Sequence, residues 1–269
     1  DAARFTIETG LHRKPGTAAI ALDSFTDAQG RLTMRVALNN DDMPFLVDSV
    51  SSAVAACDIA VKRIIHPVLS VVRDDALTLL EISRKRLDGQ ARESFIYLET
   101  ERVDARARRK LENILSAVLA DVRGAVTDWR DMLAALSADA DSLHDSEGTA
   151  LIRWFLDNNM TILAHERISS NGARSDRLGL SRVTDAPVLA EDSVALAIKW
   201  FEDGGVAPLV LKSNRVSTVH RNVQLDLIVI PVTTGDRITG VAVTAGLWTS
   251  AALATTPEAI PVLRTHLAA

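Results

Sequence analysis

The sequence predicts an α+β protein of two domains. Its 269 residues exceed the roughly 150 that a single domain usually contains. Apolar and polar side chains alternate over residues 31–38, which is typical of a half-buried strand. Apolar residues at helical spacing then form one continuous stripe: Leu111, Ile114, Leu115, Val118, Leu119 and Val122. Strand and helix patterns of this kind occur in both halves of the chain, as expected for helices packed against mostly antiparallel sheets.

In the first half, the pattern predicts strands at residues 17–23 and 31–38, joined by a turn at residues 27–30. A helix is expected over residues 44–57, because Pro44 suits a first helical turn. A β-rich run at residues 59–73 is interrupted by Pro67, and strands follow at 76–83 and 94–100. The long helix would begin after Asp104 as its N-cap, and a short strand is expected after Gly124.

Residues 137–148 are small, polar and acidic without periodicity, which predicts a linker and divides the chain into domains 1–140 and 141–269. The second domain should contain a helix at 150–157 and strands at 160–168 and 178–183, separated by a polar loop at 169–177. A helix around residues 194–201 should end at Gly204. Strands at 209–213, 224–232 and 238–248 follow, and a last helix should begin near Pro257 with Thr256 as its cap.

The composition excludes several function classes. The net charge of −5 argues against a nucleic-acid partner, because phosphate binding requires clustered Lys and Arg. A run of about 18 apolar residues is absent, so we expect no membrane-spanning segment. The single cysteine, Cys57, fits a reducing compartment, and we expect a cytoplasmic location. The chain starts without an initiator Met or signal-peptide pattern, so we expect a segment of a longer protein.

Sequence motifs for catalysis are absent. The chain has no Gly-rich phosphate-binding turn, no H-E-x-x-H helix and no G-x-S-x-G elbow. Its six histidines are scattered, and His165-Glu166 lacks a second histidine at helical spacing. We therefore predict no catalytic residues, no metal site and no cofactor in this chain.

Two loops are candidate ligand or interface sites. The first, containing Asp41, Asp42, Pro44 and Phe45, joins a strand to a helix, where backbone N–H groups attract a carboxylate. The alternative is simple capping of the helix by Asp41 or Asp42, with Phe45 in the core. We favour capping because the acidic residues would repel an anion.

The second loop lies between two predicted strands and gathers polar side chains: Arg215, Ser217, Thr218, His220 and Arg221. Such a set could hold a carboxylate or an acidic side chain of a partner. A structured hairpin loop with solvated charges is an equally good interpretation, and the sequence does not decide between them.

Several segments resemble the large bacterial NAD-dependent glutamate dehydrogenases. The most specific is D-D-M-P-F-L-V-D-S-V at residues 41–50. The other resembling segments keep the order that they have in that family. They are I-I-H-P-V-L at 64–69, E-S-F at 93–95, LADVRGAVTDW at 119–129, L-G-L at 178–180, S-T-V-H-R at 217–221, L-D at 225–226, G-L at 246–247 and I-P-V-L-R at 260–264. The resemblance covers nearly the whole chain.

This resemblance implies an N-terminal region that precedes the catalytic part and contains an ACT-like domain, with a ferredoxin-like βαββαβ core and extra strands, followed by a PAS-like domain. ACT domains that bind amino acids commonly have glycine after the proline of the first strand–helix turn. Phe45 occupies that position here, which argues against an amino acid bound at that loop.

The resemblance therefore implies a non-catalytic regulatory and oligomerisation segment. NAD would be the cofactor of the parent enzyme, which converts glutamate to 2-oxoglutarate and ammonia. The expected partners are other domains and subunits of a homo-oligomeric enzyme, with an amino acid as a possible effector. Two alternatives stay open: a self-contained module that senses amino acids or metabolites, and an enzyme in its own right.

Overall fold

The computed structural model describes all residues except Ala28, Leu87, Ala268 and Ala269, and the side chain of His266. The predicted turn at residues 27–30 therefore lies partly outside the described residues. The chain forms two compact units. The first contains Asp1–Val122 and Thr218–Asn222, and the second contains Arg123–Ser217 and Val223–Ala269. The predicted division at residue 140 stays a prediction about domain organisation.

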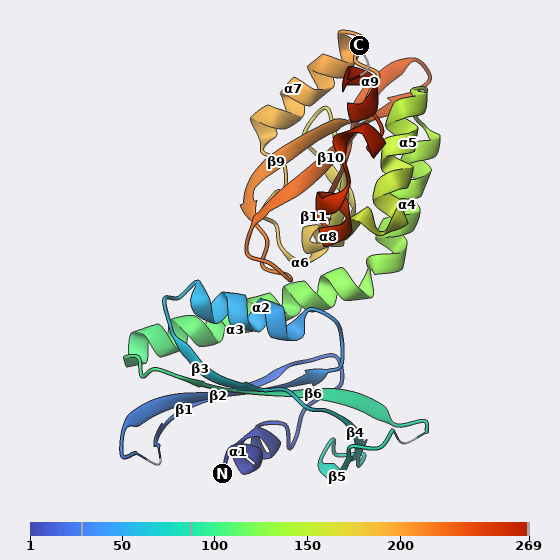
Figure 1. Cartoon of the computed structure of the whole chain (residues 1–269). Helices are drawn as coiled ribbons and strands as arrows, with labels where there is room; N and C mark the ends of the chain where they lie inside the picture. Colours follow the sequence, from blue (N-terminus) through green and yellow to red (C-terminus); the bar gives the residue numbers. More distant parts are fainter. Residues whose placement is uncertain (28, 87, 268–269) are drawn as a thin grey trace. The chain divides into compact units, whose positions relative to one another are not determined.

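The first unit is a six-stranded antiparallel sheet with helices on both faces (Figure 1). The strand order is β1-β2-β6-β4-β5, and β3 also pairs with β6. Helices α2 and α3 lie on one face, and α1 lies on the other. The elements are α1 (Ala2–Thr9), β1 (Ala19–Thr26), β2 (Leu32–Asp41), α2 (Leu46–Ala55), β3 (Val61–Ile65), β4 (Val68–Arg73), β5 (Leu79–Ser83), β6 (Ala91–Thr100) and α3 (Ala105–Thr127).

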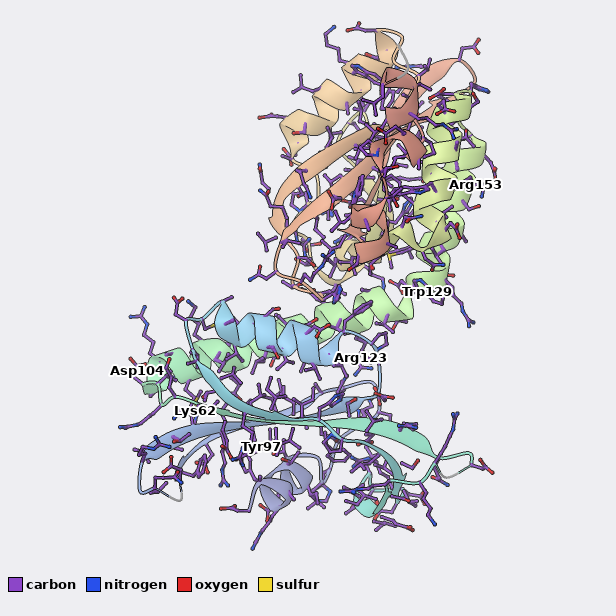
Figure 2. The ribbon with its side chains drawn as sticks, viewed as in Figure 1. Lys62, Tyr97, Asp104, Arg123, Trp129 and Arg153 are labelled. Atoms are coloured by element: carbon purple, nitrogen blue, oxygen red, sulfur yellow. The ribbon has the colours of Figure 1, made fainter. Side chains whose placement is uncertain are left out.

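The sequence patterns explain most of this unit. The apolar stripe on α3 is buried as predicted, apart from the half-buried Ile114. Each fully buried aliphatic side chain contributes roughly 1.5–3 kcal/mol to stability. Asp104 caps α3, since its Oδ1 accepts the N–H of Ala107 at 2.8 Å (Figure 2). Helix α1 was not predicted from the sequence.

The order of the strands corrects the predicted βαββαβ core. The strand expected after Gly124 is absent, because α3 continues to Thr127. The sheet position beside β2 is instead filled by β1, which precedes the first helix of the core. Gly124 lies inside α3 and packs closely against Val183. A Cβ added at Gly124 would lie 2.3 Å from Val183 Cγ2.

The second unit contains a five-stranded antiparallel sheet of order β8-β7-β11-β10-β9. Buried residues of α4, α5, η1, β7 and β10 form one apolar core that includes Met132, Leu136, Phe155, Ile162 and Ile228. The elements after α3 are α4 (Trp129–Asp141), α5 (Ser146–Trp154), η1 (Phe155–Asn159), β7 (Met160–Ser169), β8 (Arg174–Gly179), α6 (Leu180–Val183), α7 (Glu191–Glu202), β9 (Leu209–Val216), β10 (Gln224–Thr234), β11 (Arg237–Trp248), α8 (Ser250–Ala254), η2 (Pro257–Ala259) and α9 (Leu263–Leu267).

Three predictions for the second half were wrong. Residues 137–148 are mostly helical, because they complete α4 and begin α5, and only residues 142–145 connect them. Buried Leu136 and Ala140 explain this, since the small residues around them let the helix pack on the sheet. The strand predicted at 178–183 ends at Gly179, whose positive φ of 59° turns the chain into α6. The helix expected near Pro257 is a single 3₁₀ turn, η2.

Candidate functional site

The first candidate loop joins β2 to α2 and ends in an unusual backbone conformation. Phe45 is the N-cap residue of α2 and has φ 70°, in the left-handed region that side chains other than glycine rarely adopt. Pro44 precedes it and is exposed. The backbone at Phe45 thus has the glycine-like geometry of the turn, although a bulky side chain occupies the position.

The predicted capping of α2 by aspartate was wrong, because no side chain caps this helix. Asp41 instead accepts hydrogen bonds from Arg13 Nη2 and from the Gly16 backbone N–H, both at 2.9 Å. Asp42 accepts a hydrogen bond from the Ser94 hydroxyl at 2.9 Å. Both carboxylates therefore fix this loop to neighbouring segments and not to the helix end.

The structure brings the two candidate loops together, because residues 218–222 belong to the first unit. The ring of His220 lies 5.2 Å from the ring of Phe45, centroid to centroid. Its Nδ1 lies 3.1 Å from Asp48 Oδ2, and its backbone N–H donates to the buried Ser49 hydroxyl at 2.9 Å. Helix α2 therefore supplies both the apolar and the polar contacts of His220.

The other residues of the second loop have separate roles. The Thr218 hydroxyl donates to Asp121 Oδ2 at 2.6 Å within the first unit. Arg215 and Ser217 belong to the second unit, where Arg215 Nη1 donates to the Ala186 carbonyl at 3.0 Å. Arg221 is half-buried, and its backbone N–H donates to the Val219 carbonyl. Within the first unit, Thr218 and His220 therefore bond to groups of the protein itself.

Sequence reasoning missed a hydrogen-bonded array of Asp42, Ser94 and His66. His66 Nε2 lies 3.1 Å from Ser94 Oγ, and burial lowers the pKa of His66 despite the nearby Asp42 charge. The array does not suit nucleophilic catalysis, because Ser94 is fully buried and its hydroxyl donates to Asp42. Its three residues are far apart in the sequence, so no local sequence motif predicts the array.

A second missed feature is a buried ionic cluster of Arg13, Arg73 and Glu93. Glu93 Oε1 lies 2.5 Å from Arg13 Nη2 and 2.8 Å from Arg73 Nε. Arg73 Nη2 also donates to the Gly10 carbonyl at 2.8 Å. The cluster fixes the segment after α1 to the sheet, and burial makes it a structural element rather than a ligand site.

The structure bears on metal and dinucleotide binding at these loops. Among the described residues, no group of three or more His, Cys, Asp or Glu is arranged to hold a metal ion. The β2–α2 turn does not fit a dinucleotide, because Asp41 and Asp42 would repel a pyrophosphate and Phe45 occupies the place of a small residue. The described part of the chain also has no helix long and apolar enough to cross a membrane.

Comparisons with known proteins agree with the resemblance given by the sequence. Residues 3–115 match the family model described as glutamate dehydrogenase, ACT1 domain. An NAD-specific glutamate dehydrogenase of Pseudomonas aeruginosa is 31% identical over 259 residues, which is 84% of this chain and 16% of that protein. The chain belongs to the NAD-specific glutamate dehydrogenase family.

A second member of this glutamate dehydrogenase family, from Halomonas elongata, is 27% identical over 87% of the chain and 16% of its own length. The chain thus spans about a sixth of these dehydrogenases. A solved structure described as an RNA-binding light-oxygen-voltage receptor covers 92% of this chain and 80% of its own at 9% identity, but its TM-score of 0.23 is too low to support an argument.

Proposed function

We propose that this chain is a non-catalytic regulatory and assembly segment of an NAD-dependent glutamate dehydrogenase. The observation that carries the proposal is its relationship to such enzymes along most of its length, combined with the ACT1 match at residues 3–115. Its partners would be other domains and subunits of a cytoplasmic, homo-oligomeric enzyme. NAD and glutamate would bind in the part of the enzyme beyond this segment.

The candidate loops support an assembly role. The polar groups at the β2–α2 turn are already used: Asp41 by Arg13, Asp42 by Ser94, and Asp48 by His220. Carboxylates that already accept hydrogen bonds from the protein are poorly suited to bind a charged substrate. We infer that this surface instead packs against another protein domain.

We also propose that the second unit is PAS-like. Counted within that unit, its strands lie in the order 2-1-5-4-3, as in PAS domains, with helices α6 and α7 between the second and third strands. In this arrangement the unit would act as a scaffold or as a sensor of small molecules.

Deletion of residues 1–269 from the intact enzyme tests the proposed function. We expect the remaining protein to convert glutamate to 2-oxoglutarate, with altered subunit assembly or altered response to effectors. Turnover and molecular mass should be measured for the intact and shortened enzymes under the same conditions. A shortened enzyme that is folded and assembled as the intact one, but has lost all turnover, would place catalytic groups in this segment and overturn the proposal.

A further inference from the structure

The first unit contains a cavity of about 460 Å³ on the face of the sheet that carries α1. This volume lies within the range of small-molecule sites, roughly 300–1,000 Å³. One wall comes from α1, and the other walls come from β4, β5, β6 and the turn between β3 and β4. The cavity is separate from the β2–α2 turn and uses none of the candidate loop residues.

Most residues that line the cavity are apolar, and Arg84 is the cation among its described lining residues. Its apolar residues include Ile7, Leu69, Ile82 and Phe95. The exposed Arg84 reaches the cavity, and within the described part of the chain its guanidinium has no ion-pair or hydrogen-bond partner. The site therefore combines an apolar body with a single free positive charge.

The lining also lacks a negative charge. None of the described lining residues carries a carboxylate. Burial, followed by the nearby Glu99, raises the pKa of Tyr97 to about 12, so its phenol is neutral (Figure 2). The Tyr97 hydroxyl lies 3.2 Å from Glu99 Oε1, which also faces Arg63 at 3.6 Å. A ligand ammonium group would thus lose water without gaining a negatively charged partner from the lining, which is costly.

The cavity is preformed because both ends of α1 are fixed to the sheet. Near its start, the guanidinium of Arg35 lies 4.1 Å from the ring centre of Phe5 and pairs with Asp1 at 3.0 Å. After its end, Arg73 holds the Gly10 carbonyl, and Arg13 pairs with Glu93. The helix wall therefore needs no rearrangement to receive a ligand, which favours binding.

We propose that this cavity binds a small monocarboxylate with a branched or medium-length apolar chain and no ammonium group. The carboxylate pairs with Arg84, and the chain lies among Ile7, Leu69 and Ile82. A branched 2-oxo acid fits this description, and the corresponding amino acid does not. As an effector site the cavity rests on the proposed regulatory function, whereas the binding itself does not depend on it.

Calorimetric titration of the 269-residue chain tests the proposal with three probes that share one carbon skeleton: 4-methyl-2-oxopentanoate, 4-methylpentanoate and L-leucine. We expect saturable binding of both acids and affinity for leucine lower by about tenfold or more, because its ammonium loses water without gaining a partner. Equal or tighter binding of leucine, or no binding of either acid, would overturn the proposal.

Two variants with a matched control locate the site. Arg84→Gln should weaken binding of the acids by about tenfold, since it removes a charge-assisted pair. Lys85→Gln, the neighbouring exposed cation that does not line the cavity, should leave binding unchanged. Ala3→Phe should abolish binding by filling the cavity from α1 while Arg84 stays in place. Unchanged affinity in both Arg84→Gln and Ala3→Phe would show that the acids bind elsewhere.

These outcomes are distinct from a failure of the proposed function. Loss of binding in the isolated chain removes the ligand site and leaves the segment as a scaffold. Loss of all turnover by a shortened enzyme that is still folded and assembled as the intact one removes the proposed function, whether or not the acids bind.

Discussion

Individual residues in this protein hold strained or crowded backbone positions. Phe45 keeps φ 70° although a residue other than glycine costs roughly 1 kcal/mol or more there. Its ring contacts His220, which belongs to the same unit, so the strain accompanies a contact that glycine could not make. Gly179 also has a positive φ, but unlike Phe45 it lies at a sharp turn where no side chain fits.

Gly179→Ala should destabilise the second unit by several kcal/mol. The residue has φ 59° and ψ −131°, and a Cβ there would lie 2.2 Å from the Leu163 carbonyl oxygen, which belongs to the backbone of β7. Gly172→Ala is the control, because Gly172 also has positive φ but no atom within 4 Å of the added Cβ. The control should lose about 1 kcal/mol. Urea unfolding of both variants measures the difference, and equal losses would contradict the steric argument.

At the scale of elements, buried charges connect strands and helices within each unit. In the first unit, β6 contributes Glu93, which pairs with Arg73 of β4 and with Arg13 after α1. In the second unit, β7 contributes His165, whose Nδ1 lies 3.0 Å from Thr244 Oγ1 of β11 and 3.9 Å from Asp139 Oδ2 of α4. Because these groups are buried, a change of charge at one of them affects several elements.

Glu93→Gln should lower the free energy of unfolding by about 3 kcal/mol, because two buried guanidinium groups lose their shared carboxylate. Burial raises the pKa of Glu93, but hydrogen bonds from Arg73 and Arg13 outweigh it, and the pKa is lowered overall. The contribution of Glu93 is thus present above its unfolded pKa of about 4.3 and is lost as pH falls through the lower folded value.

Denaturant unfolding across acidic pH checks this prediction. The difference between wild type and Glu93→Gln should shrink as pH falls below about 4. Glu81→Gln, an exposed change on the neighbouring β5, should have little effect at any pH. A similar loss in both variants would show that Glu93 is not specially stabilising.

The contributions of His165 and Asp139 to the free energy of unfolding should change in opposite directions as the pH rises from about 4 to 6. Burial raises the pKa of Asp139 to about 6, with Arg167 opposing and Asp176 adding to the shift. Its stabilising contribution is therefore lost as pH rises through 6. Burial, followed by Arg167, lowers the pKa of His165 to about 4, so its contribution is lost as pH falls.

Single variants should separate these two contributions. Relative to wild type, the unfolding free energy of Asp139→Asn should rise by about 3 kcal/mol from pH 4 to pH 6, and that of His165→Gln should fall by a similar amount. Chemical unfolding at several pH values measures both slopes. Slopes of the same sign would refute the assignment of the two shifts.

For the whole chain, we predict a lack of dehydrogenase activity, because the sequence has no Gly-rich turn for binding a dinucleotide and corresponds to only part of the large dehydrogenases. The 269-residue chain should not reduce NAD with glutamate, and neither NAD, NADH nor glutamate should stabilise it. A ligand at about 100 times its dissociation constant adds about 2.7 kcal/mol, which a thermal-shift titration detects. A saturable shift with NAD, or formation of NADH, would show that catalytic binding groups lie in this segment.

Local periodicity was sufficient for most strands and for helices α2, α3, α5 and α7. The apolar stripe predicted α3, and alternation predicted β2, because both signals repeat every few residues. It failed at α1, α4, α6, α8 and α9, most of which are too short to show a repeating apolar pattern. The candidate site was predicted as two separate loops. Only the folded chain shows that Phe45 and His220, which are 175 residues apart in sequence (220 − 45), touch each other.

The sequence by itself determined the α+β class, helices α2, α3 and α7, the absence of catalytic motifs and the family, because these depend on residue type and on spacing along the chain. The tertiary structure decided that β1 fills the sheet position beside β2, that residues 218–222 belong to the first unit, and that α1 encloses a cavity beside Arg84. The physical reason is that such pairings arise from packing between distant segments, which no local pattern encodes.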